Sequence, residues 1–305
     1  MNPLHKYMLA PLAKAVLKPT FLLLQRLGIH VVPNQFYFPV PDTSKLPDSL
    51  WTTESAMVGI DIDDDRQIKT LSICSLYQSE YNKFPLIAAD AAAGYYVHNP
   101  YFGPVDGEVL YGMVRFFRPK RILEIGSGFS TLLSAKAILS NRADDAEYHC
   151  LLMVVDPFPS SLLCKRFFSF LEVRRIEAQA LRFEDVDELE ADDILFIDSS
   201  HVLKTGSDVQ WLYLELLPRV KPGVLVHIHD VFLPMEYPKD YVKERFRFWN
   251  EQYLLQAFLT FNKEFEVLWA GNYMKLKHPD KLAEVFSSYD SLATPVSFWL
   301  RRCSS

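Results

Sequence analysis

The sequence lacks paired cysteines and any apolar run long enough to cross a membrane. Its four cysteines stand far apart: Cys74, Cys150, Cys164 and Cys303. Their spacing matches neither a disulfide framework nor a zinc ribbon, and this favours a reducing compartment. The apolar run Phe21–Leu24 is far below the roughly 18 residues that a bilayer span needs. We therefore expect no transmembrane segment.

Basic residues are outnumbered by acidic residues. The 305 residues include 32 Lys and Arg against 38 Asp and Glu, a net charge of −6. A protein that tracks a nucleic-acid backbone normally has a basic surface, so we expect no nucleic-acid partner. Hydrophobic residues make up 49% of the chain, as in an ordinary globular protein.

The first 29 residues lack the apolar core and the small-residue cleavage site of a secretion signal. Their apolar positions recur at helical intervals, which predicts an amphipathic helix that packs on its own protein. Reversible contact with a membrane surface and a homodimer contact are the alternatives. We expect a cytoplasmic protein.

The pattern of apolar and polar residues changes at Pro119. Before it, four prolines between Val31 and Leu50 indicate a linker or wrapping loop. We expect residues 1–110 to be a helical and loop segment that covers the active site. After Pro119, short apolar runs alternate with helical segments, which is typical of a parallel sheet with crossover helices. The runs are Arg121–Ile125, Leu151–Val155, Val173–Ala178, Ile194–Ile197, Val224–Ile228, Phe265–Trp269 and Tyr273–Lys277.

The last two runs are separated by three residues, which predicts a hairpin. The predicted fold is therefore α/β: a doubly wound, Rossmann-like sheet of seven strands, mostly parallel, with an antiparallel terminal hairpin. The predicted sheet domain is 111–278, followed by a C-terminal tail over 279–305.

A glycine turn follows the first run, at Gly126-Ser127-Gly128. A strand, a Gly-x-Gly turn and a helix let the backbone approach a nucleotide-like ligand closely. The dinucleotide fingerprint fails because Thr131 stands at its third glycine. Glu124, just before the turn, can take a proton from the ammonium group of an amino-acid-like cofactor.

The stretch ILEIGSGFST resembles the first motif of class I S-adenosylmethionine-dependent methyltransferases, and the resemblance extends over about residues 110–278. It implies that the glycine turn cradles the methionine part of the cofactor. It also implies that Asp156 binds the ribose hydroxyls and that Gln179 lies near the adenine. The implied cofactor-binding residues are Glu124, Gly126, Ser127, Gly128, Ser130, Thr131, Asp156, Gln179 and Asp198.

Polar residues also follow the fourth and fifth runs. Asp198 and the pair His229-Asp230 should face one another, because adjacent parallel strands end side by side. Catechol-type and macrolide-sugar O-methyltransferases resemble the chain here, which implies a divalent metal such as Mg or Mn on Asp198, His229 and Asp230. It also implies His201 and Asp198 as the catalytic residues, with His201 as general base. An imidazole ligand at 229 favours softer ions than Mg. The metal-free alternative uses His201 or His229 as the base. His227 is expected to be a packed histidine.

The stretch Asp193–Tyr237 resembles bacterial methyltransferases that act on sugars, glycans and secondary metabolites, and the shorter stretch Trp249–Tyr253 resembles the same group. We therefore predict an O-methyltransferase with a small-molecule or glycan acceptor. An NAD-binding oxidoreductase is the main rival, disfavoured by Thr131 and the hairpin, and a catalytically silent scaffold is another. A cluster of polar and aromatic residues fits either acceptor binding or core packing: Tyr95, Tyr96, His98, Asn99, Tyr101, Phe102 and Asp106.

Overall fold

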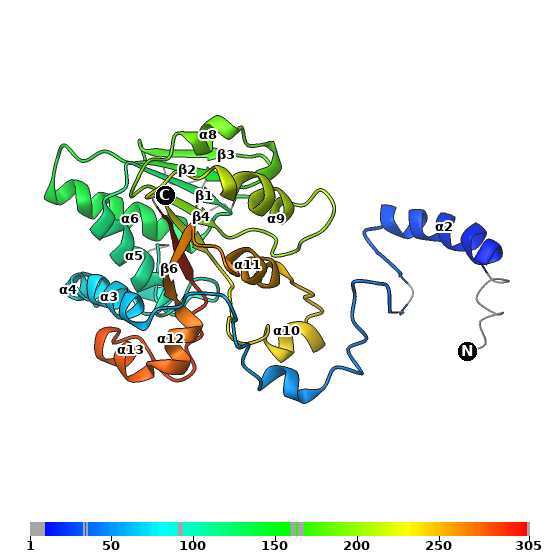
Figure 1. The fold of residues 1–305 in the computed structure, drawn as a ribbon. Coiled ribbons are helices and arrows are strands. Elements are labelled where there is room, and N and C mark those ends of the chain that lie inside the picture. The colour runs from blue at the N-terminus through cyan, green and yellow to red at the C-terminus, as the bar shows by residue number, and fades with distance from the viewer. Residues whose placement is uncertain are drawn as a thin grey trace. The chain divides into compact units, whose positions relative to one another are not determined.

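The computed structural model describes residues 10–32, 34, 36–90, 94–159, 163 and 168–303 (Figure 1). The chain divides into two compact units. Unit 1 is Met1–Leu50 with Asp240–Phe248, and unit 2 is Trp51–Lys239 with Trp249–Ser305. Residues 51–110 thus share a unit with the sheet. The expected boundary at residue 110 and the covering role of residues 1–110 stay predictions. Residues 1–9 of the expected N-terminal helix, and Cys164, lie outside the described residues.

Unit 2 contains a seven-stranded sheet with the order β3-β2-β1-β4-β5-β7-β6. The strands β1 to β5 run parallel, and β7 is antiparallel to both β5 and β6. Their bounds are β1 (Arg121–Ile125), β2 (Leu151–Val155), β3 (Leu171–Arg174), β4 (Ile194–Ile197), β5 (Leu225–Ile228), β6 (Phe265–Ala270) and β7 (Phe298–Arg302). This confirms the predicted fold class.

The predicted position of the last strand, residues 273–277, was wrong. Residues 273–277 lie in a helix, α12 (Gly271–Lys277), and the partner of β6 is Phe298–Arg302, in the segment expected to be a tail. Five residues of alternating polarity do not distinguish a strand from a helical turn. The close approach of Gly271 to Pro295 adds a reason that only the fold reveals, since a Cβ on Gly271 would lie 3.0 Å from the Pro295 carbonyl carbon.

Both faces of the sheet are covered, which explains why its strands are apolar at nearly every position. Ile122 faces one core cluster and Leu123 the other. The first cluster includes residues of α3 (Asp64–Ser75), α4 (Gln78–Tyr81), α5 (Asp106–Phe117), α6 (Phe129–Asp144), α12 and α13 (Pro279–Val285). The second includes residues of α8 (Phe183–Asp187), α9 (Asp208–Trp211), the π-helical turn Leu212–Leu216 and α11 (Glu251–Leu259).

The carboxyl ends of β1, β4 and β5 lie side by side. The Asp198 amide donates to the Ile125 carbonyl at 2.9 Å, and the His229 amide donates to the Ile197 carbonyl at 2.9 Å. The chain order reverses between β1 and β4, and open α/β sheets bind their ligands at such a point. The fold therefore gathers the predicted polar residues at one edge.

Unit 1 contains the helix α2 (Ala10–Arg26), as predicted for these residues. It ends in a Schellman motif, in which Gly28 has φ +75° and the amides of Ile29 and Gly28 donate to the carbonyls of Leu24 and Gln25 at 2.9 and 3.0 Å. The helix α10 (Lys239–Lys243) lies at the junction of the two units in sequence. Within the described residues, no helix combines the length and the apolar character that crossing a bilayer demands.

Candidate active site

The glycine turn after β1 has a different physical cause at each glycine. Gly126 has φ +95°, and a Cβ there would lie 2.0 Å from the Asp198 carbonyl oxygen, so no side chain fits. Gly128 has extended backbone and nothing within 4 Å of a Cβ position. The first glycine thus lets β1 and β4 approach, and the second leaves open space in front of α6.

Glu124 is buried beneath this turn, with 1% of its surface exposed. Its Oε1 accepts hydrogen bonds from the hydroxyls of Ser130 at 2.6 Å and Thr131 at 2.9 Å, and its Oε2 has no partner among the described residues. Burial raises the pKa of Glu124 to about 8. The unpartnered oxygen leaves the carboxylate able to pair with a cationic group.

This pKa predicts a pH-dependent stability. Between pH 4.5 and 8 the unfolded chain loses the Glu124 proton while the folded chain keeps it, so stability falls as pH rises. Glu124→Gln keeps the hydrogen-bond acceptor without the charge. We expect the variant to gain up to about 5 kcal/mol over the wild type on going from pH 4.5 to 8, since one pKa unit corresponds to about 1.4 kcal/mol.

Urea unfolding of both proteins at several pH values measures this difference. Glu147→Gln, at an exposed position, is the matched control and should show no such gain. A stability difference between wild type and Glu124→Gln that stays constant with pH would contradict the prediction.

A cavity of about 320 Å³ opens beside the glycine turn. It is lined by Tyr101, Phe102, Ser127, Gly128, Phe129, Ser130, Leu132 and Asp198. Four of the predicted cofactor residues therefore share one cavity: Ser127, Gly128, Ser130 and Asp198. The size and lining of this cavity suit part of a nucleoside cofactor.

Asp156 and Gln179 lie on the loops that follow β2 and β3. Asp156 accepts hydrogen bonds from the Ser127 hydroxyl and from the Phe158 amide, the latter at 2.7 Å. The Gln179 side-chain amide donates to the Gly206 carbonyl at 3.1 Å. Both residues thus tie loops together at the edge of the sheet that carries the cavity, and their predicted contacts with a cofactor stay predictions.

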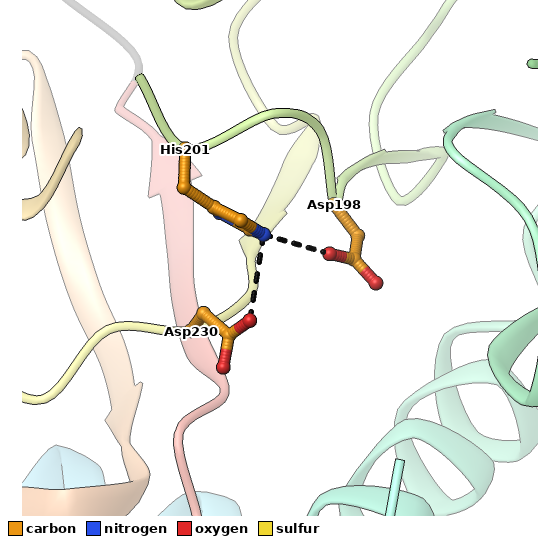
Figure 2. Close-up of side chains that lie close together, drawn as sticks. All are labelled: Asp198, His201 and Asp230. Atoms are coloured by element: carbon orange, nitrogen blue, oxygen red, sulfur yellow. Dashed lines mark ion pairs between the residues drawn. The ribbon is translucent and has the colours of Figure 1, made fainter. Parts of the chain in front are cut away.

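The cluster of Asp198, His201 and Asp230 joins the ends of β4 and β5 (Figure 2). The His201 Nε2 lies 3.4 Å from Asp198 Oδ1 and 3.4 Å from Asp230 Oδ2. Ligand atoms of all three residues lie within 4.8 Å of one another. The imidazole is nearly buried, while Asp198 and Asp230 are partly exposed. One imidazole nitrogen therefore faces two carboxylates.

Backbone strain accompanies this arrangement. His201 has φ +59° and Asp230 has φ +57°, in the left-handed backbone region that residues other than glycine seldom adopt. The His201 carbonyl accepts the amides of Asn250 at 3.0 Å and Glu251 at 3.3 Å. Such strain persists only where the surroundings enforce it, and it concentrates at functional sites.

Glu251 completes the cluster, and no role was predicted for this residue from the sequence. Its Oε2 lies 2.8 Å from His201 Nδ1, and 2% of its side chain is exposed. The Trp249 ring lies 4.3 Å from the His201 ring. The only signal in the sequence was the resemblance of Trp249–Tyr253 to other methyltransferases. A carboxylate on Nδ1 fixes the imidazole orientation and directs Nε2 toward Asp198 and Asp230.

The charges of these groups are coupled. Burial alone would lower the pKa of His201, but the carboxylates of Asp198 and Glu251 raise that pKa well above its usual value. Burial would raise the pKa of Asp198, but the His201 hydrogen bond and the His229 charge lower it. Burial raises the pKa of Glu251. Three carboxylates thus surround one imidazole.

His229 lies apart from this cluster. Its Nε2 is 3.3 Å from the Tyr101 carbonyl oxygen, and its ring is 4.8 Å from the Phe102 ring. The group of possible metal ligands among the described residues contains His201 where the sequence predicted His229. The reason is the turn after β5, where Asp230 has φ +57° and its carboxylate faces His201, while His229 lies against Phe102. The His227 ring stacks on the Phe196 ring, with 3.9 Å between the ring centroids. Burial lowers the pKa of His227 well below its usual value. Both observations agree with the expected structural role of this histidine.

The aromatic and polar cluster of residues 95–106 is largely structural. Tyr95 and Phe102 belong to the core, Asn99 accepts the amides of Tyr101 and Phe102, and Asp106 accepts the amides of Val296 and Ser297. Tyr101 differs, because 78% of its surface is exposed. Its ring lies 6.4 Å from that of Phe129, and both residues line the cavity. Tyr101 is therefore the member of this cluster with an exposed ring at the site.

Comparison with known proteins adds to this geometry. Residues 123–231 match a family model described as a methyltransferase domain. An uncharacterized protein of Archaeoglobus fulgidus is 26% identical over 160 residues, which cover 51% of this chain and 69% of that protein.

Two solved structures are also similar. The apo-structure of CmcI-N160 is 18% identical, with 67% of this chain and 73% of that chain covered and a TM-score of 0.37. A SAM-dependent methyltransferase of Anabaena variabilis is 12% identical, with 82% and 100% covered and a TM-score of 0.33. The match to the family model spans β1 to the end of β5, and so includes the glycine turn and the cluster. Residues 123–231 therefore match a methyltransferase domain, and the strand order and the cavity beside the glycine turn agree with that match.

Proposed function

We propose that this enzyme methylates a hydroxyl group of a sugar, glycan or secondary metabolite, and that the acceptor hydroxyl binds at Asp198, His201 and Asp230. The observation that carries the proposal is the His201 Nε2 facing two carboxylates, one of which also lines the cavity. A hydroxyl is a weak nucleophile that must give up its proton, and an oriented imidazole is the usual group to take it.

The residues around the glycine turn suit the methyl donor. Glu124 offers an unpartnered oxygen, Gly128 offers open space, and Asp156 offers a carboxylate beside Ser127 of the turn. S-adenosylmethionine, when bound, supplies a methyl group on a positively charged sulfur. Asp198 lines the cavity and belongs to the cluster, so the donor and acceptor sites meet at this side chain.

Four side chains around His201 have separate roles in deprotonating and positioning the acceptor hydroxyl. Because the pKa of His201 is raised, Nε2 must first lose its own proton, so we expect turnover to rise with pH. With the Nδ1 proton held by Glu251, Nε2 then takes the proton of the acceptor hydroxyl. Trp249 packs on the imidazole and excludes water from one side of it. Asp198 and Asp230 stabilise the imidazolium that forms. Holding the hydroxyl in line with the methyl group supplies much of the remaining rate enhancement.

A divalent metal is the second part of the proposal, and the excess of carboxylates over cations at the cluster favours it. The atoms that would hold it are carboxylate oxygens of Asp198 and Asp230 and the His201 Nε2. When bound there, the ion would acidify a nearby hydroxyl. The same Nε2 cannot hold a cation and accept a proton at once, so the two roles of His201 exclude each other. A histidine in the set favours Mn over Mg.

Metal removal tests this part. If the cluster holds a metal, chelation should reduce turnover at least tenfold, added Mn²⁺ should restore it, and Asp230→Asn should weaken Mn²⁺ binding in calorimetry. Asp187→Asn, at an exposed position in α8, is the matched control and should bind Mn²⁺ as the wild type does. Full activity after exhaustive chelation, with no metal in elemental analysis, would reject the metal and leave the His201 base.

The acceptor class needs its own test. Glycosides, nucleotide-sugars and hydroxylated aromatic compounds can be screened for transfer of a labelled methyl group. We expect transfer to an oxygen of one of these classes. The oxidoreductase alternative predicts tight NADH binding and no calorimetric response to S-adenosylhomocysteine. Cytoplasmic location and a homodimer stay predictions.

A further inference from the structure

The N-terminal part of the chain has a charge opposite to that of the rest. Residues 1–41 contain Lys6, Lys14, Lys18 and Arg26 and no Asp or Glu, and the first acidic residue is Asp42. The remaining residues carry 28 basic and 38 acidic side chains, a net charge of −10. Such an asymmetry within one chain indicates a partner surface for the basic part.

The segment Lys18–Val32 exposes apolar side chains as well as cations. Lys18 and Arg26 are exposed in it. Its exposed large apolar residues are Leu22, Leu23, Leu27, Ile29, Val31 and Val32. Leu23 and Leu27 expose 60% and 68% of their surface. Unit 1 therefore builds a regular helix and a defined helix end without burying these side chains in its own core.

The combination restricts the kind of partner. An anionic bilayer surface takes up apolar side chains at its interface and attracts Lys and Arg at its headgroups, with about a fivefold gain in binding for each cation. A symmetric contact between two copies of the segment would bring like charges together, with no acidic residue to pair them. The run Phe21–Leu24 is too short to span, so such a segment lies along the surface.

We propose that Lys18–Val32 is an interfacial anchor that binds reversibly to membranes rich in anionic lipids. The net charge of −10 on the remaining residues opposes contact with the same surface. The segment, rather than the acidic part of the chain, is then the part that touches the lipid. This proposal is independent of the acceptor and of the metal.

The experiment uses the full chain and sedimentation with vesicles of phosphatidylcholine containing 30% phosphatidylglycerol, and with vesicles of phosphatidylcholine alone. We expect binding to the anionic vesicles that weakens in 0.5 M NaCl, because surface charges are screened within about 3–8 Å at such salt. Lys18→Glu with Arg26→Glu should lower this binding about 30-fold or more. Leu23→Ser with Leu27→Ser should lower it too.

Lys69→Glu with Lys263→Glu is the matched control, since both lysines are exposed in unit 2 and the change in net charge is the same. This pair should bind the vesicles as the wild type does, and all variants should retain binding of S-adenosylhomocysteine. Equal binding to both kinds of vesicle, or an equal loss in the control pair, would overturn the proposal. A third outcome would also overturn it: the wild type binds no vesicles, forms a dimer in light scattering, and becomes monomeric on Leu23→Ser with Leu27→Ser. The partner of the segment would then be a second copy of the chain.

Discussion

Replacing His201 with alanine or asparagine should lower turnover about 100-fold or more and leave the affinity for S-adenosylhomocysteine nearly unchanged. The reason is that His201 Nε2 faces Asp198 and Asp230, where an acceptor proton must go, whereas the glycine turn lies on another strand end. Initial rates with an acceptor found in the screen measure turnover, and calorimetry measures the cofactor product.

The two substitutions separate chemistry from backbone strain. Alanine at φ +59° adds strain, while asparagine adopts the left-handed region readily and still cannot accept a proton at neutral pH. His149→Ala, an exposed histidine before β2, is the control and should keep full activity. Wild-type turnover in His201→Asn would remove His201 from the mechanism, both as a base and as a metal ligand.

Glu251→Gln refines the same test. The amide can still hydrogen-bond to Nδ1 but no longer stabilises a positive charge on the ring. A positioning role predicts a lower turnover number with little change in KM, and partial recovery in the charged variant Glu251→Asp. A merely structural role predicts that Gln, being isosteric, is tolerated.

Gly126→Ala should have the second large effect. A Cβ at this position would lie 2.0 Å from the Asp198 carbonyl oxygen, in a backbone conformation with φ +95°. The ends of β1 and β4 must then move apart, and we expect a loss of about 3 kcal/mol or more in the free energy of unfolding. Cofactor binding should fall with it, because Asp198 and the turn move together.

Two other glycines serve as controls for this substitution. Gly206 has φ +72° and nothing within 4 Å of a Cβ, so Gly206→Ala should cost only the backbone strain of about 1 kcal/mol. Gly128→Ala, in extended backbone facing open space, should weaken cofactor binding without lowering stability. Denaturant unfolding and calorimetry on the three variants give the comparison. Similar stability for Gly126→Ala and Gly206→Ala would show that the close approach to Asp198 has little energetic weight.

The polar strand ends illustrate how far sequence reasoning extends. Asp198 and Asp230 could be placed together because parallel strands end side by side, and their neighbours Ile197 and Ile228 are buried strand residues. The same rule does not say which side chain points into the site after a strand ends. His229 and Asp230 are adjacent in sequence yet face different surroundings, and the left-handed turn at Asp230 decides which one joins His201.

The sequence alone determined the parts that depend on local pattern. Buried strands of Val, Ile and Leu, the glycine turn and the acids after the strands identify a doubly wound sheet, because these signals lie within a few neighbouring residues. Only the tertiary structure decided the contacts between distant segments. Glu251 contacts His201, which is 50 residues away in the sequence. Residues 273–277 were expected to pair with β6, but Phe298–Arg302 forms that strand and pairs with β5 as well. Such pairings depend on how loops pack and which buried polar atoms need partners, and no local pattern in the chain encodes that choice.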